Sequence, residues 1–533
     1  MPSSGSAEQA HAILRQPADK DETTMSGNLF DLIRERVPAV DARFIETPDG
    51  RIWTYGDMLA RSGQMANILT LRGVEPGDRV AVQTEKSAEA IMLYLATLRA
   101  GAVYLPLNTA YTLTELDYFI GDAEPRLIVC DPAKQAGLKD LAAKHGIEAV
   151  DTLDAHGKGS LTAAADEAPM SFADVPRADD DLAAILYTSG TTGRSKGAML
   201  THRNLSSNAL ALQEYWQFTA RDVLLHALPI YHTHGLFVAT NTILLAGAAM
   251  LFVPRFDADE VMRLLPRATS MMGVPTFYTR LVQHSACTRA ACAHMRLFIS
   301  GSAPLLAETH REFEARTGHV ILERYGMTET GMNTSNPYDG ERIAGTVGFP
   351  LPGVEARVAA PESGVALGAD EIGVIEVRGP NVFSGYWRMP EKTREEFRSD
   401  GFFITGDIGK IDPRGYIHIV GRAKDLIITG GFNVYPKEIE SEIDVLPGVT
   451  ESAVIGLPHP DFGEGVTAVI VLQKGAVLSE KDVAASLQDR LARFKLPKRV
   501  LFVDDLPRNT MGKVQKNVLR EQYADLYAAA VTA

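Results

Sequence analysis

The sequence predicts an α/β fold with largely parallel sheets, and two observations support this prediction. Helix-like and strand-like patterns alternate through most of the chain, as in "SAEAIMLYLATLRAGAVYLPLN" over residues 87–108. Short apolar runs also end directly on glycine or polar loops, namely "PRLIVCD" (125–131), "MRLFISG" (295–301) and "HVILERYG" (319–326). Loops that hold phosphate or substrate are therefore expected at the carboxyl ends of the strands.

The chain is expected to divide into a large N-terminal domain and a small C-terminal domain, because its 533 residues are too many for one core. Residues 25–421 are predicted to form α/β subdomains followed, from about residue 350, by a β-rich subdomain with "GVIEVRG" and "GYIHIVG". Residues 422–533 are predicted to form an α+β domain with a helix from about Ser479 to Arg493.

Residues 1–24 are polar and of mixed charge, and we expect them to form a disordered tail. They lack the apolar segment of a secretory signal, although a targeting segment and a start at Met25 both stay open as alternatives.

Composition excludes some classes of partner. A net charge of −14 argues against a nucleic-acid partner, and no apolar run is long enough to span a membrane. The three cysteines form no disulfide or metal-binding pattern, which favours a reducing, cytoplasmic location.

The segment "LYTSGTTGRSKGAMLTHRN" (186–204) predicts a loop that binds a polyphosphate. Glycines let backbone N–H groups approach an anion, hydroxyls add donors, and a lysine adds positive charge. A Walker A loop would need Ser or Thr directly after the lysine, but Gly197 follows Lys196. The predicted phosphate-binding residues of this segment are Thr188, Ser189, Gly190, Thr191, Thr192 and Lys196.

Six further motifs follow at long spacings: "LPIYHTHGL" (228–236), "ISGSAPLL" (299–306), "ERYGMTET" (323–330), "GFFITGDIG" (401–409), "GRAKDLIITGGFNVYPKEIE" (421–440) and "LPRNTMGKVQK" (506–516). In this order the motifs resemble those of the adenylate-forming superfamily of acyl-CoA synthetases, luciferases and adenylation domains. "IYHTHGLFVATN", "MGVPTFYTRL" and "RYGMTETGMNTSNPYDGERIAGTVG" further resemble bacterial malonyl-CoA synthetases.

The resemblance implies an enzyme that adenylates a carboxylic acid with ATP and then transfers the acyl group to CoA. It implies a nucleotide site that includes, besides the phosphate loop, Gly301, Ser302, Ala303, Glu323, Tyr325, Gly326, Asp407 and Arg422. Glu329 is expected to ligate Mg²⁺, which prefers carboxylate and phosphate oxygens. Lys513, Thr328 and His232 are the implied catalytic residues.

The resemblance also implies that the C-terminal domain is mobile, with a hinge at Lys424. One orientation would bring Lys513 to the site for adenylation. The other would bring a CoA channel at Gly430 and Gly431 for thioester formation. Regulation by a lysine acetyltransferase and deacetylase acting on Lys513 is a further expectation, because acetylation removes the charge of that lysine.

Malonate as the acid requires a cation for its second carboxylate, because an unpaired buried charge is very costly. "GVPTFYTRL" is predicted to start a helix near Pro275, with Arg280 on the flank of its buried face. Arg280 is our first candidate for this cation and Arg296 the second, while His232 and Met327 are expected to contact the acyl group.

Other functions stay open at this point. Methylmalonate or another small acid could replace malonate, and a carrier protein supplied in trans could replace CoA. A nucleotide-binding protein without activity is a third alternative, which the presence of Lys196, Glu329, Asp407 and Lys513 disfavours.

Overall fold

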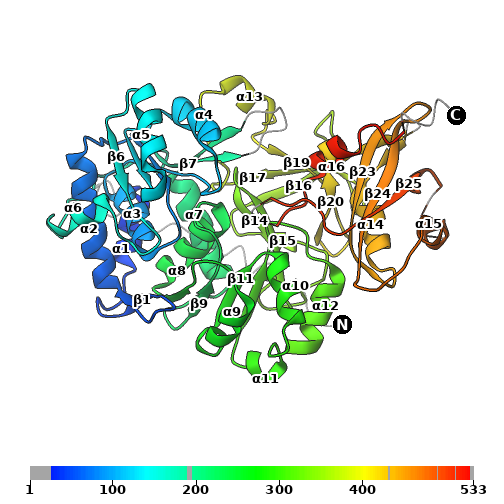
Figure 1. Cartoon of the computed structure of the whole chain (residues 1–533), viewed down its shortest axis with the longest axis horizontal. Helices are drawn as coiled ribbons and strands as arrows, with labels where there is room; N and C mark the ends of the chain where they lie inside the picture. The colour runs from blue at the N-terminus through cyan, green and yellow to red at the C-terminus, as the bar shows by residue number, and fades with distance from the viewer. Residues whose placement is uncertain are drawn as a thin grey trace, which may run out of the picture.

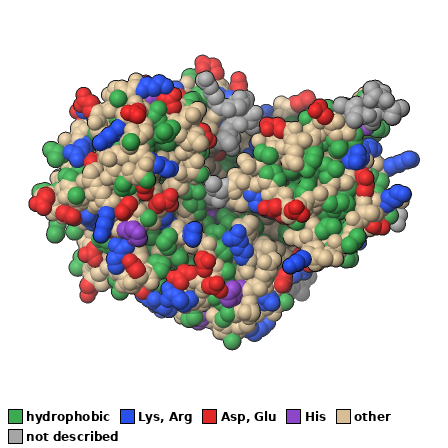
Figure 2. All heavy atoms as spheres, viewed as in Figure 1, with side chains coloured by type: hydrophobic (Ala, Val, Ile, Leu, Met, Phe, Trp, Pro, Cys, Tyr) green, Lys and Arg blue, Asp and Glu red, His purple; other side chains and the backbone are tan. Residues whose placement is uncertain are grey.

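A computed structural model of the chain describes residues 26–188, 195–429, 432–488, 490–491, 493–509 and 512–527. It has a large N-terminal body and a smaller C-terminal body, which lies at the right of Figure 1 in orange and red. Figure 2 shows an indentation between the two bodies in the same view. None of the described helices has both the length and the apolar character needed to cross a bilayer.

The strands of the described residues form four sheets. The first sheet has the order β15-β14-β13-β12-β11-β9-β10-β1-β2. Its strands are β1 (Arg43–Glu46), β2 (Ile52–Thr54), β9 (Val223–His226), β10 (Ala249–Phe252), β11 (Ser270–Gly273), β12 (Leu297–Ser300), β13 (Leu322–Met327), β14 (Gly331–Ser335) and β15 (Phe349–Pro350). The strands from β10 to β13 pair in parallel, as the alternating pattern predicts.

The second sheet has the order β18-β8-β7-β4-β3-β5-β6. Its strands are β3 (Arg79–Gln83), β4 (Val103–Pro106), β5 (Leu127–Cys130), β6 (Ala149–Thr152), β7 (Leu182–Thr188), β8 (Lys196–Thr201) and β18 (Gly385–Tyr386). The strands β3 to β7 pair in parallel, whereas β7 and β8 form an antiparallel pair that flanks the predicted phosphate loop.

The third sheet is the predicted β-rich subdomain, with antiparallel order β16-β17-β19-β20. Its strands are β16 (Glu355–Ala359), β17 (Gly373–Arg378), β19 (Phe403–Ile411) and β20 (Ile417–Arg422). The fourth sheet belongs to the C-terminal body and comprises β21 (Ile427–Thr429), β22 (Phe432–Val434), β23 (Val449–His459), β24 (Gly463–Leu472) and β25 (Arg499–Val503).

Helices cover these sheets. In the N-terminal body they are α1 (Leu29–Glu35), α2 (Tyr55–Leu71), α3 (Ala88–Arg99), α4 (Leu113–Ala123), α5 (Gln135–Lys144), α6 (Ser160–Asp166), α7 (His202–Tyr215), α8 (Asn241–Ala246), α9 (Ala258–Leu264), α10 (Pro275–Gln283), α11 (Arg289–Cys292), α12 (Ala307–Thr317) and α13 (Pro390–Glu395). Helix α7 contacts β7 and β8 of the second sheet and β14 of the first, so it packs between them.

Shorter helical turns and the C-terminal helices complete the fold. The turns are η1 (Pro132–Lys134), the π-helix η2 (His234–Thr240), η3 (Leu265–Arg267), η4 (Ala423–Asp425) and η5 (Arg493–Lys495). The C-terminal helices are α14 (Pro436–Asp444), α15 (Glu480–Gln488) and α16 (Lys516–Gln522). Helix α15 starts where predicted and ends before Arg493, which opens the separate turn η5.

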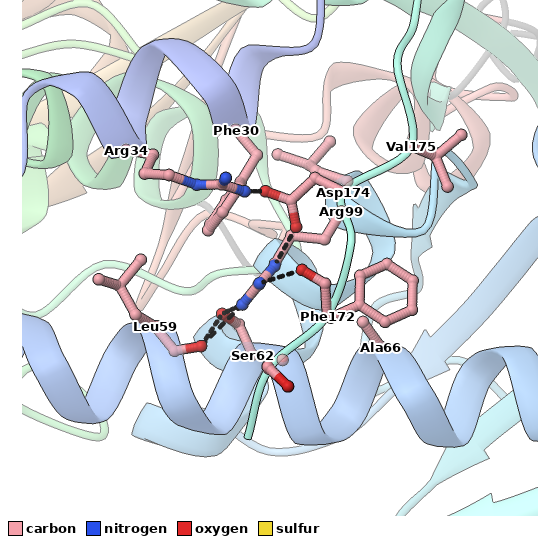
Figure 3. Close-up of polar contacts among 12 residues, drawn as sticks. Phe30, Arg34, Leu59, Ser62, Ala66, Arg99, Phe172, Asp174 and Val175 are labelled. Atoms are coloured by element: carbon pink, nitrogen blue, oxygen red, sulfur yellow. Dashed lines mark hydrogen bonds and ion pairs between the residues drawn. The ribbon is translucent and has the colours of Figure 1, made fainter. Parts of the chain in front are cut away.

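A buried ion cluster ties the first helix to the rest of the N-terminal body (Figure 3). Asp174 accepts from Arg99 Nε at 2.6 Å and also pairs with Arg34 of α1. Arg99 further donates to the Leu59 carbonyl at 2.7 Å and the Ser62 hydroxyl at 2.9 Å on α2. The cluster therefore joins α1, α2, α3 and the loop before β7, and it lies away from the nucleotide motifs.

Candidate active site

The predicted phosphate loop joins β7 to β8, but Ser189, Gly190, Thr191 and Thr192 lie outside the described residues. Its two ends are described. Thr188 closes β7, and its hydroxyl lies 3.4 Å from Oε1 of Glu329. Lys196 opens β8, and its Nζ lies 4.0 Å from the ring centroid of Tyr386. The hairpin thus brings both ends of the loop to one place.

Thr328 and Glu329 occupy the tip of the hairpin formed by β13 and β14. The Glu329 carboxylate is buried, and this burial raises its pKa. Tyr386 places its hydroxyl 3.1 Å from Glu329 Oε1 and 2.8 Å from Glu396 Oε2. Because a tyrosine hydroxyl has one proton to donate, it cannot satisfy both carboxylates at once.

This carboxylate arrangement fits a hard cation such as Mg²⁺. One buried carboxylate beside the Thr188 hydroxyl offers oxygen ligands, and Mg²⁺ commonly binds through one or two carboxylates together with substrate phosphates. Within the described ranges no three His, Cys, Asp or Glu side chains converge as a metal cage. A cation here would therefore be shared between Glu329 and a bound phosphate.

The predicted ribose residues form one connected group. The Tyr325 hydroxyl donates to Asp407 Oδ2 at 2.5 Å, and Arg422 Nε lies 2.8 Å from Asp407 Oδ1. The Asp407 charge raises the pKa of Arg422. Asp407 comes from β19 and Arg422 from β20, whose antiparallel register places the two residues opposite each other.

The loop after β12 carries Gly301, Ser302 and Ala303 beside this group. Ser302 has φ +71°, a left-handed conformation that non-glycine residues rarely adopt, and its hydroxyl lies 3.2 Å from His234 Nδ1. Two residues of β13, Gly326 and Glu323, lie in equally crowded or buried surroundings. A Cβ at Gly326 would lie 2.0 Å from the Gly331 carbonyl oxygen, and burial raises the pKa of Glu323 to about 8.

Lys513 lies at the same site although it belongs to the C-terminal body. It is half-buried, and burial lowers its pKa to about 8, with the charges of Arg422 and Asp407 acting in opposite directions. Its own charge contributes to the lowered pKa of His232. A Cβ at the preceding Gly512 would lie 3.2 Å from the side chain of Thr276, at the start of α10. The C-terminal body therefore brings the charge of this lysine near both the ribose group and His232.

The residues predicted to contact the acyl group fall into two places. His232 and Met327 are half-buried at the site, and burial lowers the pKa of His232 to about 4. Helix α10 starts at Pro275 as predicted, and Tyr278, Leu281 and Val282 are buried on it. Arg280 on this helix is exposed and forms no ion pair with any described residue.

Arg296 lies elsewhere, which corrects its assignment to the acyl pocket. It stands at the amino end of β12, whereas the site residues follow the carboxyl end of that strand. Its Nε and Nη2 donate to Asp222 at 2.6 and 3.0 Å, and its Nη1 donates to the Trp216 carbonyl at 3.0 Å. These contacts pair the guanidinium with groups of the chain at the amino end of β12, away from the site residues.

The predicted hinge and channel lie at the start of the C-terminal body. Lys424 sits in the turn η4, directly after β20, and burial lowers its pKa. The adjacent Asp425 pairs with Arg520 of α16 at 2.5 Å. Gly430 and Gly431 lie outside the described residues.

Three residues near the site escaped prediction: Glu396, Tyr386 and Arg324. Glu396 holds Lys196 Nζ at 2.9 Å, and the two residues lie 200 positions apart in the chain. Arg324 is part of the "ERYGMTET" motif, and the prediction of Tyr325 beside it gave no reason to expect a buried charge. No signal in the sequence pointed to Glu396.

Comparison with known proteins identifies the family. Residues 34–387 match the family described as "AMP-binding enzyme", and residues 438–513 match "AMP-binding enzyme C-terminal domain". The chain belongs to the AMP-binding enzyme family. It is 36% identical to the malonate--CoA ligase of Arabidopsis thaliana, with 94% of this chain and 90% of that protein covered. It is 37% identical to the mitochondrial malonate--CoA ligase ACSF3 of Mus musculus, with coverages of 88% and 86%.

Solved structures of this family give the same result. The ATP-bound MatB of Rhodopseudomonas palustris is 65% identical to the chain and superposes with a TM-score of 0.93. The match covers 94% of this chain and 100% of MatB. Apo MatB, with the same identity and coverage, gives a TM-score of 0.83. The family resemblance and the fold predicted from the sequence are thus confirmed.

Proposed function

We propose that this AMP-binding enzyme is an ATP-dependent ligase that joins malonate to CoA through a malonyl-adenylate and releases pyrophosphate and AMP. The placement of Lys513 is the observation that carries the proposal. This lysine belongs to the C-terminal body, yet it interacts electrostatically with Asp407 and Arg422 and with His232, so its charge lies near all three. Malonate as the acid is supported by the malonate--CoA ligases among the relatives and by the likeness to MatB.

In the first step a carboxylate oxygen of the acid forms a bond to the α-phosphorus of ATP, and the bond between the α-phosphorus and the bridging oxygen breaks. Both reacting groups are negative, so a positive charge placed between them lowers the barrier. Lys513 would supply that charge, and Thr328 at the hairpin tip would donate to the α-phosphate. Lys196 and the loop after Thr188 would hold the departing pyrophosphate.

The ribose group would orient the nucleotide. Asp407 has two carboxylate oxygens that can accept from the ribose hydroxyls, with Arg422 and Tyr325 holding the carboxylate in place. Holding the reactants in one geometry can replace much of the entropy cost of their encounter. Glu329, together with the Thr188 hydroxyl, would hold Mg²⁺, which would neutralise phosphate charge when bound.

In the second step the CoA thiolate attacks the acyl carbon, and the carbon–oxygen bond to AMP breaks. The positive charge of Lys513 is not needed for this step. A rotation at Lys424 would therefore exchange Lys513 for the segment that contains Gly430 and Gly431. The neutral His232, whose pKa lies near 4, would adjoin the acyl group without adding charge.

Two further expectations belong to this proposal. Acetylation of Lys513 would remove the charge that the first step needs. A cytoplasmic, reducing location agrees with Cys130, Cys287 and Cys292, which are free and buried.

A panel of acids tests the proposal. Purified enzyme with ATP, Mg²⁺ and CoA is given malonate, methylmalonate, succinate, acetate or propionate, and AMP release and thioester mass are measured. We expect malonyl-CoA and AMP in equal amounts, with methylmalonate as the nearest competitor. Release of ADP, or a faster reaction with a monocarboxylate, would contradict the proposal. An apo carrier protein with its phosphopantetheine arm, offered in place of CoA, tests the loading reaction.

A further inference from the structure

Helix α4 contacts both strands that flank the predicted phosphate loop, although the chain between the helix and the loop spans more than sixty residues. The Tyr118 hydroxyl donates to the carbonyl oxygen of Ser195 at 2.8 Å, and Ser195 directly precedes β8. The Tyr187 hydroxyl donates to Asp122 Oδ2 at 2.5 Å, and Tyr187 is the residue before the last of β7. One helix is therefore bound to the chain on each side of the loop (Figure 1).

The spacing along α4 explains how one helix makes both contacts. Tyr118 and Asp122 are four residues apart, so they lie on the same face of the helix. Phe119 packs beside them, with its ring centroid 4.7 Å from that of Tyr187, and the rings of Tyr118 and Tyr187 are 6.1 Å apart. A capping box at Thr112 fixes the first turn of the helix. The helix thus presents two polar groups from a packed aromatic base.

Trp387 adds a second connection between α4 and the hairpin of β7 and β8. Its Nε1 donates to the Asp122 carbonyl oxygen at 3.0 Å, and its backbone N–H donates to the Gly197 carbonyl oxygen at 2.8 Å. A Cβ at Gly197 would lie 3.3 Å from Cβ of Trp387, so the two segments are in close contact. The end of α4 is therefore joined to β8 as well as to β7.

These contacts fix groups that we expect to face the phosphates. The Ser195 carbonyl belongs to the same planar peptide as the N–H of Lys196, so the bond from Tyr118 also fixes the direction of that N–H. Thr188 lies opposite Lys196 in the antiparallel register, directly after the bound Tyr187. A binding site that is already ordered loses less conformational entropy when its ligand binds.

We propose that Tyr118 and Asp122 are positioning residues, which hold the two ends of the phosphate loop in place for the β- and γ-phosphates of ATP. This inference rests on the nucleotide site of the proposed function and assigns a role in it to α4. The two side chains act through Ser195 and Tyr187 and are not expected to touch the nucleotide. AMP lacks the β- and γ-phosphates, so the contacts should matter for ATP and not for AMP.

A purely structural role for α4 predicts a different result. ATP and AMP share the adenosine and the α-phosphate, and both would use the ribose group around Asp407. A general loosening of the N-terminal body would therefore weaken the binding of both nucleotides alike. The ratio of the two dissociation constants separates positioning of the loop from support of the fold.

Matched tyrosine substitutions test the proposal. Tyr118→Phe and Tyr187→Phe each remove a hydroxyl and keep the ring. Tyr416→Phe is the control, because the Tyr416 hydroxyl also donates to a backbone carbonyl, that of Glu341 at 2.7 Å, beside β20. For each protein the Kd values of ATP and of AMP are measured by calorimetric titration with Mg²⁺, and the Tm is recorded.

We expect Tyr118→Phe and Tyr187→Phe each to raise the Kd for ATP by roughly 3- to 10-fold and to leave the Kd for AMP unchanged. Tyr416→Phe should keep both values. Asp122→Ala should weaken ATP binding as Tyr187→Phe does, whereas Asp122→Asn should restore it, because an amide oxygen can still accept from the Tyr187 hydroxyl. Thioester formation from supplied malonyl-adenylate, which has no β- or γ-phosphate, should stay at the wild-type rate in all variants.

Three outcomes would overturn the assignment: an unchanged Kd for ATP in both tyrosine variants, an equal rise for ATP and AMP, or the same ATP-specific loss in Tyr416→Phe. If Tyr118→Phe does not fold, Tyr187→Phe and the pair of Asp122 variants give the same readout. The titrations contain neither acid nor CoA. A failure of malonate as the substrate would therefore leave the result for α4 standing, and a failure of the α4 proposal would leave malonate as the substrate.

Discussion

The Nζ of Lys196 lies 2.9 Å from Oε1 of Glu396 and above the ring of Tyr386. The lysine that we expect to bind the phosphates of ATP is therefore paired with a carboxylate of the chain itself. Both side chains are largely buried, at 8% and 20% exposure. We therefore expect ATP to compete with Glu396 for this charge, so that the ion pair would set part of the cost of nucleotide binding.

Glu396→Gln should tighten ATP binding and destabilise the ligand-free enzyme. Loss of the competing carboxylate should lower the Kd for ATP by roughly 5- to 30-fold, or about 1–2 kcal/mol. Lys196 loses its partner, so the Tm without ATP should fall and the rise in Tm on adding ATP should grow. Calorimetric titration and thermal unfolding measure both. Glu395→Gln, whose side chain is 65% exposed, is the control and should change neither. Weaker ATP binding in Glu396→Gln would show that Glu396 assists the nucleotide.

Lys513→Ala should abolish adenylation by several orders of magnitude and leave thioester formation from supplied malonyl-adenylate nearly intact. The reason is that its charge is expected to act only while the carboxylate attacks the α-phosphate. Pyrophosphate release and single-turnover thioester formation separate the two steps. The exposed Lys481 on α15 of the same body is the control residue. An equal loss in both steps, with the fold intact, would rule out a role limited to adenylation.

Adenylation should weaken as pH rises through about 8, because burial lowers the pKa of Lys513 to about 8. Below this pH the lysine is charged and active, and above it the charged fraction falls about tenfold per pH unit. The pH profile of kcat/KM for ATP reports this free-enzyme pKa. Lys513→Arg should keep whatever activity it has to higher pH, since an arginine stays charged. A profile of the wild type that is flat from pH 7 to about 9.5 would contradict the assignment.

Acetylated Lys513 should leave the enzyme inactive in adenylation, because acetylation removes the charge. In the observed orientation Lys513 is half-buried against the site. Bound ATP and malonate should hold the lysine there, so an acetyltransferase should modify it faster when both are absent. Protein acetylated to full occupancy by genetic encoding, verified by mass spectrometry, provides the measurement. Full activity of that protein would refute the expectation, and deacetylation should restore activity.

Lys424→Pro should retain adenylation and lose thioester formation. Lys424 lies within the 3₁₀ turn η4, and the fixed φ of proline is close to that of such a turn. Proline should therefore hold the observed orientation, in which Lys513 is at the site. Lys424→Ala, which leaves the backbone free to rotate, is the control. Retention of both steps by the proline variant would move the hinge to another residue.

The sequence by itself determined the fold class, the family and the order of the site motifs. These depend on local patterns: the alternation of apolar runs with glycine loops predicted parallel strands, and Pro275 marked the start of α10. The spacing of seven motifs was specific enough to point to AMP-binding enzymes, which the comparisons confirm.

Tertiary structure decided which charges meet, because charge pairing depends on distance in space and burial. Lys196 pairs with Glu396 across 200 positions of the chain, and neither segment predicts the other. Arg296 and Arg324 each adjoin a short apolar run in the sequence. In the structure Asp222 pairs with Arg296, whereas Nε and Nη2 of Arg324 are buried without a hydrogen-bond partner among the described residues. The sequence identifies a cationic side chain, but only packing determines whether its charge is solvated by water, paired with a carboxylate of the chain or left for a substrate.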